Sequence, residues 1–164
     1  MKQITPFLWF DKQAEEAMNF YISIFPNSKI LDIKRYPEGP LEPPMQGMEG
    51  KVLTASFELN GNKFLCLDGG PMFKATEAVS FYVECETQEE VDSYWNGLSE
   101  GGDPAAQQCG WIKDKYGFSW QIIPEALPRL LNDPDTAKSG RVLQAMLKMK
   151  KIIVADLQAA ADQD

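Results

Sequence analysis

The hydrophobic pattern of the first half of the chain changes period several times, and each change predicts a new element. Residues 4–10 form an unbroken apolar and aromatic run, which is typical of a buried strand. Apolar residues then recur on one face of an amphipathic helix; they are Ala14, Ala17, Met18, Tyr21, Ile22 and Phe25. Further strands are expected at 29–36, 52–59 and 62–68, the last two joined at the hairpin signal Asn60-Gly61. The first half therefore predicts the order β-α-β-β-β.

The second half of the chain repeats this order. A helix is expected to begin at a capping box formed by Thr87 and Glu90. The expected strands are 78–85, 107–113, 119–123 and a weakly marked one near 105–109. Shifted by 74 residues, the two halves align without a gap over fifteen positions. We interpret this as a duplicated module, the alternative being chance likeness between two amphipathic helices.

The chain changes character after Pro124, where a helical pattern with many apolar residues begins. So much apolar surface must pack either on its own domain or on a partner subunit. We expect one domain over 1–164, made of a module at 1–76, a second module at 77–124 and a helical extension at 125–164. The loop at 37–50 holds four prolines and three glycines; it is interpreted as a lid, a plain surface loop or a dimer arm.

Composition excludes several kinds of chemistry. The chain has no histidine, which rules out a Ser-His-Asp triad, a His general base and a typical zinc site. Its net charge of −8 disfavours binding to nucleic acid. The three cysteines form no metal or disulfide pattern, and free thiols indicate a cytoplasmic protein. No apolar run approaches the length of a membrane span, so no membrane partner is expected.

Three segments of the chain carry a family resemblance. They are ITPFLWFDKQAEEAMNFY, ELNGNKFLCLDGGP, and DKYGFSWQIIPEALPRLLNDPD running into AMLKMKK. They resemble the PhnB-like group, often named demethylubiquinone methyltransferase-like, of the vicinal oxygen chelate superfamily. That superfamily includes glyoxalase I, extradiol dioxygenases and bleomycin-resistance proteins. The resemblance implies an α+β fold of two tandem βαβββ modules with a C-terminal helical tail. It also implies a cleft between the modules and a homodimer.

The resemblance also places the metal site of the metal-dependent relatives. There, two His/Gln and two Glu side chains bind a divalent cation that chelates the substrate. The matching positions here are Thr5 or Pro6, Leu65 or Cys66, Val79 or Ser80, and Gln121. Only Gln121 keeps a good oxygen donor, and magnesium and manganese prefer carboxylates. We therefore expect no catalytic metal and no cofactor.

The candidate ligand-pocket residues are Trp9, Cys66, Ser80, Trp111 and Gln121. The tryptophans could equally be core residues, Cys66 a small buried hydrophobe, and Gln121 a satisfied core amide. No catalytic residue can be named.

Three functions stay open for the chain. The first is binding of an unidentified small, partly apolar molecule in the cleft between modules, without a metal. The second is a superfamily enzyme, such as an isomerase, lyase or transferase, with a non-standard site. The third is a dimeric scaffold whose cleft is closed by its own side chains. The methyltransferase label has no support from the residues, because no glycine-rich strand-turn-helix segment is present.

Overall fold

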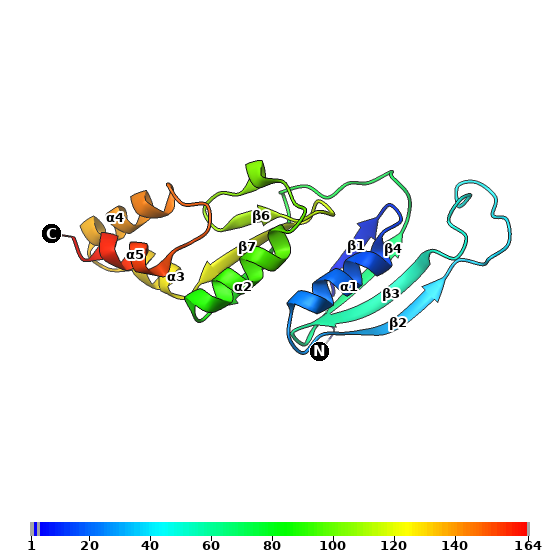
Figure 1. Ribbon diagram of the computed structural model, residues 1–164, viewed down its shortest axis with the longest axis horizontal. Coiled ribbons are helices and arrows are strands. Elements are labelled where there is room, and N and C mark those ends of the chain that lie inside the picture. The colour runs from blue at the N-terminus through cyan, green and yellow to red at the C-terminus, as the bar shows by residue number, and fades with distance from the viewer. Residues whose placement is uncertain (1, 3, 164) are drawn as a thin grey trace. The chain divides into compact units, whose positions relative to one another are not determined.

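The computed structural model describes residue 2 and residues 4–163, and the chain forms two compact units, Met1–Ala75 and Thr76–Asp164. Figure 1 shows that each unit contains its own sheet and its own helices. Each unit is described by itself below.

The first unit has the predicted order of elements. They are β1 (Phe7–Phe10), α1 (Ala14–Ile24), β2 (Lys29–Arg35), β3 (Val52–Leu59) and β4 (Asn62–Asp68). The sheet has the order β1-β4-β3-β2, in which β1 runs parallel to β4 and the other pairs are antiparallel. The Asn60-Gly61 turn joins β3 to β4 with both residues at positive φ, as a tight hairpin requires.

The core of the first unit lies between α1 and one face of its sheet (Figure 1). Met18 and Tyr21 of α1 are fully buried, as are Phe57 and Cys66 of the strands. Because side chains alternate along a strand, the neighbouring residues point to the opposite face, where Phe7 stays half exposed. The periodicity read from the sequence therefore corresponds to one buried and one more open face.

The second unit begins with a similar arrangement. Its elements are β5 (Ser80–Cys85), α2 (Gln88–Ser99), β6 (Trp111–Lys113) and β7 (Ser119–Pro124). The sheet has the order β5-β7-β6, with β5 parallel and β6 antiparallel to β7. The predicted cap is present, since Thr87 Oγ1 accepts the backbone N–H of Glu90 at 3.2 Å. The Glu90 carboxylate accepts the N–H of Glu86 at 2.7 Å, one residue before the position of a standard capping box.

The weakly marked strand near 105–109 is not formed, so the second sheet has three strands within the described residues. Pro104–Ala106 is a short 3-10 helix, capped by Asp103, whose side chain accepts the N–H of Ala105 at 2.9 Å. Only an isolated bridge between Gln108 and Trp111 follows. Proline lacks the N–H that a strand ladder requires, and the chain then turns back through positive φ at residues 109 and 110.

Three helices follow the second sheet and pack on the second unit itself. They are α3 (Ala126–Leu131), α4 (Thr136–Met146) and α5 (Val154–Ala161). Their buried side chains form one cluster with the end of β7; it consists of Ile123, Leu127, Leu130, Val142, Ile152, Leu157 and Ala161. Of the two alternatives for the apolar tail, the structure shows packing within its own unit. None of the helices in the described chain is both long and apolar enough to cross a membrane.

Candidate ligand-binding site

A row of three side chains crosses the second sheet on the face opposite α2. Tyr82 of β5 pairs with Gln121 of β7, and Gln121 pairs with Trp111 of β6. The neighbours of Gln121 on the same strand, Trp120 and Ile122, are buried in the core. Since alternate residues point to opposite faces, the row lies on the side away from that core.

A pocket of about 290 Å³ lies where this row meets α3 and α4. Its lining comes from four parts of the unit: the sheet, the turn before β6, α3 and α4. The lining residues are Tyr82, Cys109, Trp111, Gln121, Ile123, Leu127, Pro128, Leu131 and Met146. All nine are uncharged, and most are apolar or aromatic. This is the usual chemistry of a small-molecule site, in which few polar groups converge on an apolar surface.

Gln121 is the polar side chain at the centre of the sheet row. Its Nε2 donates a hydrogen bond to Ser80 Oγ at 2.9 Å. Its Oε1 accepts no hydrogen bond from the residues that the structure describes. The amide is thus held by one of its ends, and the half-buried side chain keeps an acceptor for another molecule.

Cys109, which lines the pocket, forms hydrogen bonds with backbone carbonyls at and just after the end of α4. The Cys109 thiol donates to the carbonyl of Met146 at 3.5 Å, and its backbone N–H donates to the carbonyl of Met149 at 2.9 Å. The next residue, Gly110, has a φ of +85°. A Cβ there would lie 2.7 Å from Ile123 Cδ1, so the turn can approach the sheet only with glycine.

The sequence-predicted pocket residues separate into two groups. Trp111 and Gln121 line the pocket, and Ser80 contacts Gln121 from β5. Trp9 and Cys66 belong to the first unit. Sequence reasoning missed the contributions of Cys109, α3 and α4, because their apolar residues carry no local signal that distinguishes a pocket wall from a core.

Trp9 is engaged by its own unit. Its Nε1 donates to the carbonyl of Gly70 at 2.9 Å, and its ring meets Phe73 edge-on at 4.9 Å between centroids. A Cβ at Gly69 would overlap the Trp9 ring. Trp9 is therefore packed over a glycine-containing turn, and a ligand contact for it stays a prediction.

Cys66 is fully buried on the α1-covered face of the first sheet. Burial, with a smaller effect of the nearby Asp68, raises the pKa of its thiol to about 12. The thiol is thus neutral and inaccessible to a ligand in this structure. Of the alternatives Leu65 and Cys66, it is Leu65 that pairs with Phe7 on the more open face.

The side chains at the superfamily's metal positions do not fit a divalent cation. Leu65 offers no donor atom, Cys66 is a protonated thiol, and the Ser80 hydroxyl already accepts from Gln121. Within the described ranges, no three His, Cys, Asp or Glu side chains are grouped to hold a metal ion. Hard divalent cations require anionic oxygen ligands, and these positions supply none.

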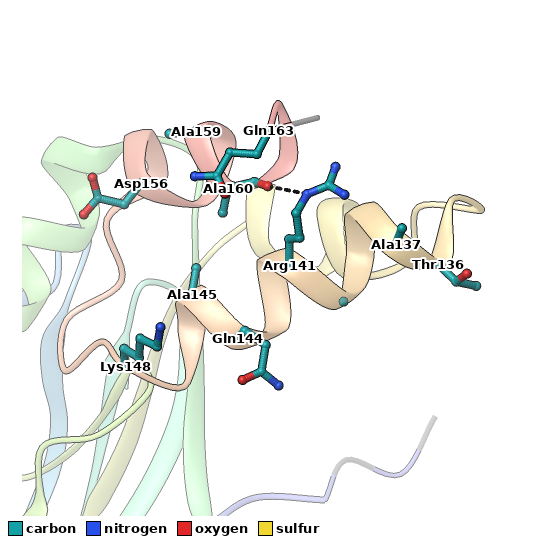
Figure 2. Close-up of a pocket in the computed structure, with 11 residues that line it drawn as sticks. Thr136, Ala137, Arg141, Gln144, Ala145, Lys148, Asp156, Ala159, Ala160 and Gln163 are labelled. Atoms are coloured by element: carbon teal, nitrogen blue, oxygen red, sulfur yellow. Dashed lines mark hydrogen bonds between the residues drawn. The ribbon is translucent and has the colours of Figure 1, made fainter.

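Figure 2 shows a second cavity of this unit, a groove of about 710 Å³ between α4 and α5. Small residues such as Gly140 and Ala145 line it, together with the long side chain of Lys148. The Arg141 guanidinium lies across it and donates from Nε to the carbonyl of Ala160 at 3.1 Å. That guanidinium satisfies backbone carbonyls at the end of α5, so the smaller aromatic pocket is the better candidate for a ligand.

The fold defines the class of this protein: it is an α+β member of the vicinal oxygen chelate superfamily, as the sequence predicts. The model of the family described as 3-demethylubiquinone-9 3-methyltransferase matches residues 2–123, and the chain belongs to this PhnB-like family.

Two solved structures illustrate the likeness. The putative 3-demethylubiquinone-9 3-methyltransferase, PhnB protein, from Bacillus cereus is 43% identical, with a TM-score of 0.63 over 75% of this chain and 99% of that one. The protein PA1353 from Pseudomonas aeruginosa is 19% identical, with a TM-score of 0.61 over 76% of this chain and 98% of that one, and shows the fold alone. A comparison with curated proteins gives no match.

Proposed function

We propose that the second unit binds a small, partly apolar molecule in the pocket between its sheet and α3–α4, and that it uses no catalytic metal. The observation that carries this proposal is the lining itself: eight uncharged side chains surround the amide of Gln121, which keeps a free acceptor. Apolar area removed from water stabilises a complex by roughly 25 cal/mol per Å², and the single amide supplies orientation.

The family description names a methyl-transfer reaction, which normally uses the cationic donor S-adenosylmethionine. The pocket has no carboxylate to pair with a sulfonium, since all nine of its described lining residues are uncharged. Burying an unpaired charge is costly. S-adenosylmethionine is accordingly a useful negative probe in the test of the proposal.

The test is calorimetric titration of the full chain with indole, S-adenosylmethionine and Mn²⁺ as separate probes. We expect binding of indole alone. A Leu131→Arg variant, which places a charge in the pocket, is expected to lower indole affinity at least tenfold. Leu143→Arg, the same change at an exposed residue of α4, is the matched control and should bind like the parent protein.

A second measurement does not depend on any variant. Saturating indole should shift the side-chain N–H resonance of Trp111 in a ¹H–¹⁵N spectrum more than that of Trp95, which lies on α2 away from the pocket. Absence of indole binding at millimolar concentration, or a shift confined to Trp95, would overturn the proposal. The homodimer implied by the resemblance also stays a prediction, and light scattering coupled to size exclusion measures it.

A further inference from the structure

The pocket presents one acceptor at the middle of the sheet. Gln121 lies on β7, the central strand of the order β5-β7-β6, and its Oε1 has no donor among the described residues. The flanking Tyr82 and Trp111 lie on the edge strands. A ligand that enters the pocket displaces water from this oxygen. It must therefore either donate a hydrogen bond or leave the oxygen unsatisfied, which lowers affinity.

The contact with Ser80 shows which end of the amide faces the pocket in this structure. Nε2 donates to Ser80 Oγ at 2.9 Å. This orientation leaves the amide oxygen as the open end. The geometry thus favours a ligand with an O–H or N–H over one with only an acceptor.

The charge and the volume of the pocket further restrict the class of ligand. The lining offers no counter-charge, and the chain as a whole carries −8, so anions are disfavoured both in the pocket and on approach. An engineered apolar cavity of about 150 Å³ takes up benzene. A pocket of about 290 Å³ is close to twice that volume. Two fused rings correspond to this size.

We infer that the ligand of this pocket is a neutral molecule of about two fused aromatic rings whose O–H or N–H donates to Gln121 Oε1. This inference rests on the proposed function, because it specifies the ligand class of the same pocket. Leu127, Leu131 and Met146 supply the apolar wall from α3 and α4. All three lie beyond residue 123, where the match to the family model ends, in segments whose sequence resembles the PhnB-like group.

Three probes of nearly the same size test the inference by calorimetry at pH 7: 2-naphthol, 2-methoxynaphthalene and 2-naphthoate. The first carries a donor, the second only an acceptor, and the third a negative charge. We expect 2-naphthol to bind about tenfold more tightly than 2-methoxynaphthalene, equivalent to ~1.4 kcal/mol. We expect 2-naphthoate to bind at least tenfold more weakly than 2-naphthol.

The variant Gln121→Met keeps the length of the side chain but removes the amide. It is expected to bind 2-naphthol and 2-methoxynaphthalene equally well. Gln13→Met, at an exposed position of the first unit, is the matched control and should keep the tenfold preference. Equal affinities of the two probes for the parent protein would overturn the inference even if Gln121→Met fails to fold. A preference that survives in folded Gln121→Met would overturn it as well.

The outcomes separate this inference from the proposed function. If all three probes bind with equal affinity, the pocket is a ligand site, as the proposed function states, but Gln121 does not select the ligand. If none of the three probes binds and indole does not bind either, both the proposed function and the inference are wrong.

Discussion

The side chain of Asp68 caps α1 from a position 54 residues away in sequence: its Oδ1 accepts the backbone N–H of Ala14 at 2.9 Å. Gln13, the residue at the N-cap of α1, makes no side-chain cap. The other carboxylate oxygen of Asp68 accepts the N–H of Val52 at 3.0 Å. One fully buried carboxylate at the end of β4 thus satisfies the first turn of α1 and the start of β3.

Replacement of Asp68 by alanine is expected to destabilise the first unit strongly. Both N–H groups would stay buried without an acceptor, at about 1–3 kcal/mol for each. Urea unfolding followed by circular dichroism measures the loss of free energy. Asp32→Ala, at an exposed position of β2, is the control and should change stability by less than about 0.5 kcal/mol. Equal effects of the two substitutions would contradict the capping role.

Asp68 also predicts a pH dependence of stability. Burial raises its pKa above the ordinary value, and the hydrogen bonds from Ala14 and Val52 offset only part of this effect. The folded state therefore binds the proton more tightly than the unfolded state does. The stability that comes from this tighter proton binding is fully present below the unfolded pKa of about 3.9. It is lost as pH rises through the raised pKa of Asp68 in the folded state.

The pH effect is measured as the difference in unfolding free energy between the parent protein and Asp68→Asn, at several pH values from about 3 upward. The difference in unfolding free energy in favour of the parent protein should decrease as pH rises from about 4, and it should become constant above the raised pKa of Asp68. Other carboxylates titrate in both proteins, so the difference isolates Asp68. A difference that widens with pH would show that the pKa of Asp68 is lowered by folding.

Gln88, at the start of α2, forms hydrogen bonds with the backbone of the segment that leads into α5. Its Nε2 donates to the carbonyl of Ile152 at 3.1 Å, and its Oε1 accepts the N–H of Val154 at 2.8 Å. Gln88→Ala should speed hydrogen exchange at the Val154 amide by about tenfold or more, because the two hydrogen bonds that hold this segment, of about 1 kcal/mol each, are lost. The substitution also removes the bond from Gln88 Nε2 to Asp92 Oδ1 at 3.0 Å. Exchange at the β5–β7 ladder should stay unchanged, and faster exchange there would indicate general destabilisation instead.

A matched control lies beside this contact. Asp92 forms an ion pair with Lys151 at 2.6 Å, with both side chains partly exposed. Asp92 Oδ1 also accepts from Gln88 Nε2 at 3.0 Å. Asp92→Asn keeps an amide oxygen that can accept from Gln88, and it removes only the ion pair, which contributes about 1 kcal/mol at most. It is expected to alter exchange at Val154 much less than Gln88→Ala does.

The three cysteines should differ sharply in reactivity. Cys66 and Cys85 are fully buried, and burial raises the pKa of each thiol to about 12. Cys109 is half-buried and lines the pocket. Since the thiolate is the reactive form, iodoacetamide at pH 8 should label Cys109 first in the native protein, as peptide mass spectrometry will show.

The same labelling reports on the pocket. Saturating 2-naphthol should slow alkylation of Cys109 several-fold, and Cys109→Ser should abolish the fast phase. Rapid labelling of Cys66 in the folded protein would contradict its burial against α1. A rate at Cys109 that 2-naphthol does not change would place this probe elsewhere.

Local sequence signals predicted much of the fold because they depend on short-range physics. The change from a strand pattern to a helical one located β1 and α1. The hairpin signal at Asn60-Gly61 located the turn between β3 and β4, and Thr87 capped α2 as expected. The weak strand near 105–109 failed because Pro104 and the positive φ values at 109 and 110 favour turns over a ladder.

By itself the sequence determined the order of elements, the absence of histidine chemistry and the place of Gln121 on a strand, because these follow from residue type and periodicity. That this strand lies at the centre of its sheet was decided by the tertiary structure. Only the tertiary structure decided that Leu65, not Cys66, lies on the open face. That choice depends on pairing with β1 across the sheet, and a slip of one residue reverses every side chain. Only the tertiary structure joined Gln121 to Met146 in one pocket. Their meeting depends on how α3 and α4 pack beside the sheet, and no local pattern encodes such long-range contacts.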